Sequence, residues 1–117
     1  MQHRDLVVVL EEDPQIRSLL ERWLDEAGYA VAAQVPDGDT RPVLVIADLP
    51  DPHVAGVLIR SLQEYRVAVL ATSARFRRGL AGSAETARRL GVQGVLPKPF
   101  TRTELLAAVR DAMEGTA

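Results

Sequence analysis

The chain has 117 residues, of which 47% are hydrophobic, and this length and composition suit one folded domain over residues 1–117 with a single core. It contains no cysteine, which excludes disulfides, thiolate metal sites and thiol catalysis. The formal net charge is only −2 and the longest apolar runs have five residues, so direct nucleic-acid binding and a membrane span are not indicated, and without a signal-peptide core we expect a cytoplasmic protein.

The first predicted element is a strand over Leu6–Leu10, a continuous apolar run typical of strands buried on both faces of a parallel sheet. The acidic run Glu11–Asp13 follows it directly. Asp13 and Pro14 are the residue types of a helix N-cap and first turn, and Gly28 has the place of a C-terminal cap. The positions of this helix that we expect to face the core are Ile16, Leu19, Leu20, Trp23, Leu24 and Ala27.

A second, more weakly patterned strand is predicted over Tyr29–Val35, and a third over Val43–Ala47. Only Pro36–Pro42 lies between them, whereas parallel strands are usually joined by a dozen or more residues. Seven residues span about 10 Å as a helix and ~23–25 Å when extended. The connection must travel ~16 Å back along the sheet and ~10 Å sideways. We therefore predict an extended strap in place of the second helix, or else a shortened second strand.

The strap has a predicted consequence for the surface of the protein. A missing helix leaves one face of the sheet less covered near the first and third strands. Because exposed apolar surface tends to be an interface, we expect a homodimer or another partner contact there.

After Asp48, a loop over Leu49–His53 leads to a helical stripe of Val54, Val57, Leu58 and Leu62. A fourth strand over Val67–Ala71 ends in Thr72 and Ser73. We expect a long polar loop over Arg75–Ser83 and then a short helix over Glu85–Leu90.

The last strand is predicted over Val92–Leu96, and a rigid turn, Pro97–Phe100, follows it. Thr101 and Glu104 have the spacing of a capping box at the start of the final helix. The core stripe of that helix is Leu105, Leu106, Val109 and Met113. Five strands alternating with helices predict an α/β fold, a doubly wound five-stranded parallel sheet with helices on both faces.

Polar groups follow four of these strands, and in such a sheet they meet at one edge. They are Glu11, Glu12, Asp48, Thr72 and Lys98. Converging carboxylates favour a hard divalent cation such as Mg²⁺, which would keep Asp48 ionised as a nucleophile. A hydroxyl and an ammonium would bind the oxygens of a phosphoryl group. Lys98 is the only lysine among 14 basic residues, which indicates a need for a compact ammonium at that position.

Each of these residues alone has an ordinary structural explanation, such as a helix cap or a solvated surface charge, and it is their combination that indicates phosphoryl transfer. The segments that carry them, Val8–Arg17, Asp48–Gly56, Ala71–Ala74 and Gly91–Phe100, resemble the motifs of receiver domains of two-component response regulators. The resemblance covers essentially the whole chain and implies the strand order 2-1-3-4-5.

The resemblance also implies roles for individual residues. Asp48 would accept a phosphoryl group from a histidine kinase or a histidine phosphotransfer protein, making the domain a conformational signalling switch rather than an enzyme in the usual sense. Glu12, Asp48 and the backbone carbonyl of Pro50 would bind Mg²⁺ directly, with Glu11 acting through water. Thr72 would hydrogen-bond the phosphoryl group and Lys98 would pair with it, and the bond from Lys98 to Pro99 would be cis.

The chain departs from the family pattern at several positions. Glu12 stands where an aspartate is usual, and Val95 stands where an aromatic usually reports the switch. Phe76 is interpreted as loop packing rather than as a substitute for that aromatic. Thr72 and Lys98 are 26 residues apart, a few more than usual. The surplus lies in a basic region whose arginines could form a docking face for an acidic partner; they are Arg75, Arg77, Arg78, Arg88 and Arg89.

Two other functions are compatible with the pattern. A pseudo-receiver would use the same fold as a protein-interaction or dimerisation module without phosphorylation, which Glu12, Val95 and the missing helix favour and which Asp48, Thr72 and Lys98 oppose. A flavodoxin-like cofactor binder would need glycine or hydroxyl residues after the first strand. The acidic run Glu11–Asp13 would repel a phosphate there, so this third function is disfavoured.

Overall fold

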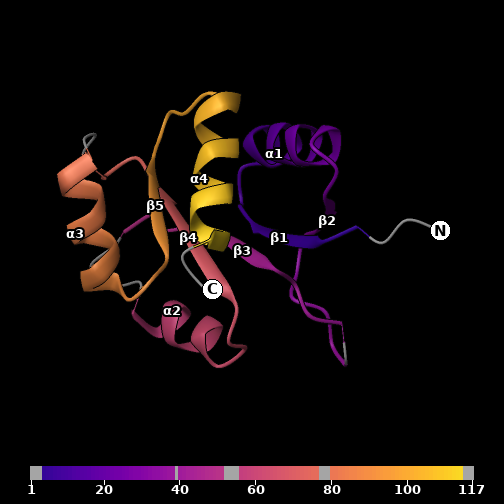
Figure 1. The fold of residues 1–117 in the computed structure, drawn as a ribbon, viewed down its shortest axis with the longest axis horizontal. Coiled ribbons are helices and arrows are strands. Elements are labelled where there is room, and N and C mark those ends of the chain that lie inside the picture. Colours follow the sequence, from indigo (N-terminus) through magenta and orange to yellow (C-terminus); the bar gives the residue numbers. More distant parts are fainter. Residues whose placement is uncertain (1–3, 39, 52–55, 77–79, 115–117) are drawn as a thin grey trace.

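The structure is a computed structural model that describes residues 4–38, 40–51, 56–76 and 80–114. Its elements along the chain are β1 (Leu6–Leu10), α1 (Pro14–Glu26), β2 (Ala30–Ala32), β3 (Leu44–Asp48), α2 (Gly56–Gln63), β4 (Ala68–Ser73), α3 (Leu80–Leu90), β5 (Gly94–Pro97) and α4 (Arg102–Glu114). The strands form one sheet in the order β2-β1-β3-β4-β5 with every neighbouring pair parallel, as predicted (Figure 1).

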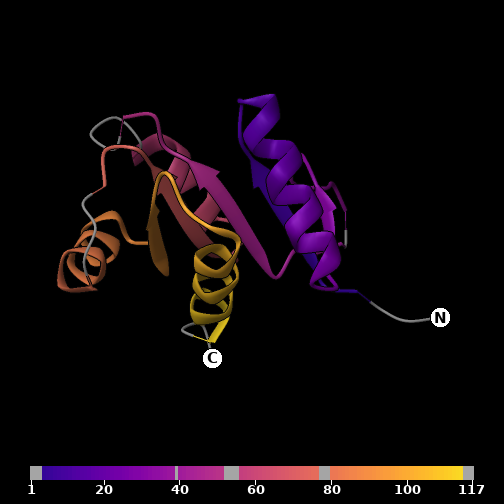
Figure 2. The ribbon, with the colours of Figure 1, turned by 90° about the horizontal axis from the view of Figure 1, so that it is seen from above.

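Two apolar layers hold the sheet between its helices. Alternate residues of the central strands, such as Val7 and Ile46, pack with α1 and α4 on one face. The intervening residues, such as Val8 and Val45, pack with α2 and α3 on the other. Figure 1 shows α1 and α4 on one side of the sheet and α2 on the opposite side, and Figure 2 shows α1 and α4 from above. Burial on both faces explains why these strands are continuous apolar runs.

The connection from β2 to β3 is not helical at any described residue between Ala33 and Val43, which confirms the predicted strap. Figure 1 shows it as a non-helical loop that runs away from the sheet and back, on the same side as α2. Strand β2 has only three residues, so the predicted strand was too long after Ala32. The short connection requires this shortening, because residues freed from the strand supply part of the return path.

The sheet face beneath the strap keeps its cover, and the prediction of an apolar opening near the first and third strands was wrong. Val8 and Val45 are fully buried. The same cluster contains Leu49, Ile59 and Leu62, with Val35 of the strap packed against it. Side chains from α2, from the loop after β3 and from the strap therefore contribute to the apolar layer on this face.

Helix α1 begins and ends as predicted. The Asp13 side chain accepts hydrogen bonds from the backbone N–H groups of Gln15 and Ile16, at 2.9 and 3.4 Å. Gly28 has φ of +99°, a left-handed conformation that follows the last helical turn. The predicted core stripe was too wide, because Leu19 and Ala27 are exposed.

Helix α2 turns a different side to the core from the one predicted. Ile59 and Leu62 are buried, whereas Val57 and Leu58 are exposed, and Val54 lies outside the described residues. Apolar residues occupy most positions of the first turn, so the spacing alone allowed more than one inward face. Contact with the sheet decides between them.

The later elements occur as predicted, but several of their boundaries differ. Strand β4 runs from Ala68 to Ser73 instead of from Val67 to Ala71, and β5 ends at Pro97 instead of Leu96. Helix α3 begins at Leu80, so Leu80–Ser83 are helical rather than part of a loop. Strand β5 begins at Gly94 rather than Val92. The capping box of α4 is confirmed, since the N–H of Glu104 donates to Thr101 Oγ1 at 3.1 Å and the N–H of Thr101 donates to Glu104 Oε1 at 2.9 Å. Within the described ranges, no helix has the length and apolar character that crossing a membrane requires.

Candidate functional site

The carboxyl ends of β3, β4 and β5 meet at one edge of the sheet. Asp48 pairs with Thr72 across β3 and β4, and Ser73 pairs with Pro97 across β4 and β5. Backbone hydrogen bonds continue past these pairs, because the N–H of Lys98 donates to Ser73 O at 3.0 Å. The parallel register therefore places an aspartate, a threonine and a lysine from distant parts of the chain beside one another.

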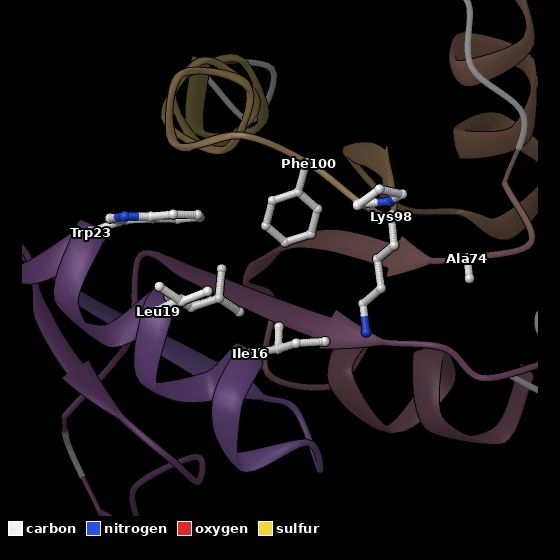
Figure 3. Close-up of a pocket in the computed structure, with 8 residues that line it drawn as sticks. Ile16, Leu19, Trp23, Ala74, Lys98 and Phe100 are labelled. Atoms are coloured by element: carbon white, nitrogen blue, oxygen red, sulfur yellow. The ribbon is translucent and has the colours of Figure 1, made fainter.

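The Lys98 side chain joins two of the predicted site carboxylates. Its Nζ lies 2.8 Å from Asp48 Oδ1 and 2.6 Å from Glu11 Oε1. Figure 3 shows this amine at the end of β3, with the alkyl chain running past Phe100. All three side chains are mostly shielded from solvent, which strengthens their attraction relative to a surface ion pair.

Two opposing effects act on the pKa of Lys98. Burial alone lowers the pKa, because it disfavours the charged form. The hydrogen bonds that the ammonium donates to Asp48 and Glu11, and the attraction of both carboxylates, outweigh burial and hold the pKa of Lys98 above its ordinary value. The lysine is therefore a fixed positive charge at the centre of the site.

Glu11 and Glu12 are adjacent in sequence but have different environments. Glu11 is buried, binds Lys98 and accepts a hydrogen bond from the N–H of Asp13 at 3.2 Å. Glu12 is exposed. Both residues follow β1, which ends at Leu10, so the path of the chain after the strand sets which carboxylate reaches Lys98. The structure thus brings Glu11, but not Glu12, into contact with Lys98, and the division of metal-binding roles between them stays a prediction.

The donor groups at this edge suit a hard cation. Asp48 and Glu11 carry two carboxylates against the single ammonium, and Pro50 follows close after Asp48 with a backbone carbonyl. No group of three or more His, Cys, Asp or Glu side chains arranged for a metal occurs in the described part of the chain. Mg²⁺ needs no such cage, because it is usually bound by one or two carboxylates together with waters and phosphate oxygens. The residues present therefore fit Mg²⁺ by their chemistry.

The other predicted site positions have ordinary packing. Thr72 is buried beside Asp48 in the sheet. Val95 and Phe76 are half-buried and pack against the same apolar cluster, as the interpretation of Phe76 as loop packing requires. Of the basic region, Arg75, Arg88 and Arg89 are exposed, while Arg77 and Arg78 lie outside the described residues, as do Pro52 and His53.

The sequence reasoning missed an apolar hollow beside Lys98. We call it the α1 hollow; it measures about 360 Å³ and its lining is Ile16, Leu19, Leu20, Trp23, Ala74, Lys98, Pro99 and Phe100. Figure 3 shows Trp23 and Leu19 on α1 facing Phe100 across it. The peptide bond from Lys98 to Pro99 is cis, as the family resemblance implied. One feature of the sequence could have indicated the hollow. The apolar stripe of α1 contains more residues than one core-facing side of a helix can bury, so some of them were bound to remain exposed.

Two curated relatives are similar to nearly the whole chain. The C4-dicarboxylate transport transcriptional regulatory protein DctD of Pseudomonas aeruginosa is 34% identical over 92% of this chain and 25% of its own length. The transcriptional regulatory protein PdtaR of Mycobacterium tuberculosis is 30% identical over 92% of this chain and 56% of its own. The chain thus spans between a quarter and about half of these relatives. No protein-family model matches the sequence.

Two solved structures share the fold over nearly their whole length. A response regulator CheY-like protein from Mesorhizobium loti superimposes with a TM-score of 0.71 and 26% identity, over 94% of this chain and 99% of its own. The receiver domain of the sensor histidine kinase PA1611 from Pseudomonas aeruginosa has a TM-score of 0.69 and 23% identity, over 96% and 99% of the two chains. That structure is described with a magnesium ion coordinated in the active-site cleft.

Proposed function

This chain belongs to the receiver domains of two-component response regulators, and we propose that Asp48 is the residue that accepts the phosphoryl group. The observation that carries the proposal is the pair of contacts from the Lys98 ammonium to Asp48 and Glu11, 2.8 and 2.6 Å long. They place a cation beside a carboxylate at the open end of three parallel strands. Receiver domains are signalling domains, and this arrangement suits transfer of a phosphoryl group to the protein itself.

The chemistry follows from these groups. A carboxylate oxygen of Asp48 attacks the phosphorus atom of a phosphohistidine on the donor protein. A phosphorus–oxygen bond forms, the phosphorus–nitrogen bond breaks, and the departing imidazole takes a proton from solvent. The Lys98 ammonium, already beside Asp48, pairs with the new phosphoryl oxygens, and the Thr72 hydroxyl donates a hydrogen bond to them.

Mg²⁺ belongs to the same proposal. The residues that would hold it are Glu12, Asp48 and the carbonyl of Pro50, with Glu11 acting through water. When bound, the ion would offset the negative charge of the carboxylates and of the phosphoryl oxygens. The magnesium described in the PA1611 receiver domain supports this assignment by fold. The same site would also hydrolyse its own acyl phosphate, which would reset the switch.

We propose that the α1 hollow receives the donor protein, a sensor histidine kinase or a histidine phosphotransfer protein. It is apolar, it opens beside Lys98, and Leu19 and Trp23 on its rim keep part of their surface exposed. A donor that places apolar side chains there would bring its histidine to the end of β3, where Asp48 lies (Figure 3). A cytoplasmic location remains part of this proposal.

Phosphorylation with a small donor tests the proposed chemistry. The protein is incubated with Mg²⁺ and acetyl phosphate and analysed by intact mass, and beryllofluoride binding is followed by the fluorescence of Trp23, the only tryptophan. We expect the addition of one phosphoryl group and a fluorescence change, both lost in Asp48→Asn. Wild-type protein that stays unmodified and does not respond to beryllofluoride would contradict the proposal and leave the function of a pseudo-receiver.

A further inference from the structure

An exposed apolar surface lies on α2 and the turn that follows it. Four large hydrophobic residues are exposed in the described part of the chain, and three of them are Val57, Leu58 and Tyr65, at 71%, 38% and 53%. The fourth, Leu19, belongs to the α1 hollow. A cluster of this kind within nine residues differs from the scattered apolar residues of an ordinary surface.

The exposed apolar residues of α2 and its following turn lie along one side of the helix. Val57, Ser61 and Tyr65 follow one another at intervals of four, the spacing of a ridge along a helix surface. The helical path extends past Gln63, because the N–H of Glu64 donates to Arg60 O at 3.3 Å and the N–H of Tyr65 donates to Leu62 O at 3.1 Å. In the middle, the Ser61 hydroxyl donates to Val57 O at 3.0 Å. The small, internally bonded Ser61 leaves room for a neighbouring backbone to approach.

A row of opposite charges runs beside this ridge. Arg60 and Glu64 are exposed and lie one turn apart. Neither forms an ion pair with any residue that the structure describes, and the Arg60 Nε donates instead to Gly56 O at 3.3 Å. The row therefore presents one unpaired positive and one unpaired negative group to solvent.

We propose that this surface binds a second copy of the same chain, with the two α2 helices antiparallel about a two-fold axis near Ser61. We call it the α2 face; it comprises Val57, Leu58, Arg60, Ser61, Glu64 and Tyr65. A two-fold axis reverses the direction of the partner helix while keeping each row on its own side. Because Ser61 is midway between Val57 and Tyr65, the valine of one copy meets the tyrosine of the other.

The charges select the same arrangement. The midpoint of Arg60 and Glu64 lies one residue beyond Ser61, so an axis about half a residue beyond Ser61 serves both rows. It leaves Arg60 of one protomer displaced by about 1.5 Å along the helix from Glu64 of the other, closer than to the other Arg60, and the pair occurs twice. A partner that carried mainly one sign of charge would leave one of the two groups opposed by its own sign, so self-association fits this face better.

The expected dimer is weak and depends on concentration. A single helical face of this length buries less than the roughly 800 Å² per partner of standard stable interfaces. The proposal does not depend on phosphorylation of Asp48, because every group it uses lies outside the site. It also differs from the contact predicted from the sequence, which was placed over β1 and β3.

Sedimentation equilibrium over a wide range of protein concentrations tests the α2 face by charge reversal. We expect the wild type to dimerise and both Arg60→Glu and Glu64→Arg to raise the dissociation constant about tenfold, since each creates two like-charge contacts in the dimer. The double variant, with both charges exchanged, should recover most of the affinity. Val57→Lys should abolish association. Arg22→Glu, a reversal at an exposed position of α1, is the matched control and should have no effect.

The alternatives give distinguishable results. Circular dichroism and thermal melting confirm that each variant is folded, and the charge variants change only exposed positions. A wild type that stays monomeric at the highest concentrations would overturn the proposal and leave the α2 face to a different partner. A dimer that tolerates Val57→Lys and shows no charge-reversal rescue would equally overturn it, because the contact would then lie elsewhere.

Discussion

The ammonium of Lys98 lies 2.6 Å from Glu11 Oε1, although 87 residues separate the two in sequence. The contact exists because β1 and β5 end at the same edge of the sheet, where Glu11 follows β1 and Lys98 follows β5. It makes the only lysine of the chain a bridge between the first acidic residue after β1 and Asp48. The protonation of the Lys98 ammonium therefore depends on both carboxylates of the site.

The first prediction concerns the pKa of Lys98. Because the chain contains one lysine, a single ¹⁵N or ¹³C NMR signal of its side chain can be followed through a pH titration. We expect its pKa to lie above the ordinary lysine value of about 10.4 and to fall in Glu11→Gln, which removes one of the two carboxylates. An unchanged titration in that variant would show that the contact with Glu11 does not persist in solution.

A second prediction follows from linkage between protonation and folding. A lysine whose pKa is raised in the folded state stabilises the fold fully below its unfolded pKa, and this contribution is lost as the pH rises through the folded value. Lys98→Met should therefore lower the free energy of unfolding at neutral pH by about 1 kcal/mol after solvent screening. Denaturation at neutral and alkaline pH should show a constant difference from wild type that shrinks above about pH 10.4.

The third prediction separates the roles of the two glutamates in Mg²⁺ binding. Glu12 is exposed, so Glu12→Gln should leave the melting temperature unchanged while weakening Mg²⁺ binding about tenfold, as measured by calorimetric titration. Glu12→Asp, which keeps the charge and shortens the side chain, is the matched comparison and should retain binding. If Glu12→Gln binds Mg²⁺ normally and Glu11→Gln does not, the assignment of the direct ligand must be exchanged.

A fourth prediction concerns docking of the donor at the α1 hollow. Leu19→Lys places a charge on its apolar rim, so phosphotransfer from a histidine kinase or phosphotransfer protein should fall at least about tenfold. Phosphorylation by acetyl phosphate should not change, because a small donor needs no docking surface. Equal loss with both donors would mean that the substitution damages the site itself.

The fifth prediction compares two glycines with positive φ. Gly28 and Gly91 have φ of +99° and +76°, and a side chain costs about 1–2 kcal/mol in this region. Gly28→Ala meets no neighbouring atom, so only this conformational penalty is expected. An added Cβ at Gly91 would lie 2.8 Å from Nε2 of Gln63, which donates to Gly91 O at 2.7 Å. Chemical denaturation should therefore show a larger loss of stability for Gly91→Ala.

Much of the fold could be predicted because it depends on local chemistry. The caps at Asp13 and Thr101 and the apolar strands are encoded within a few residues, and all appear in the structure. Seven residues, Pro36–Pro42, are too few for a helix to cover the distance between the second and third strands, so the length of this segment excluded a helix. The convergence of Asp48, Thr72 and Lys98 also followed from the pattern, since parallel strands end at a common edge.

Tertiary structure alone decided which side of each element faces inward. In α2, apolar residues surround much of the helix, so the burial of Ile59 and the exposure of Val57 depend on where the sheet lies. The separation of Glu11 from Glu12 likewise depends on the direction in which β1 delivers each carboxylate. Sequence spacing specifies which residues an element contains, but orientation is set by packing against partners that are distant in the chain, and short-range periodicity does not contain that information.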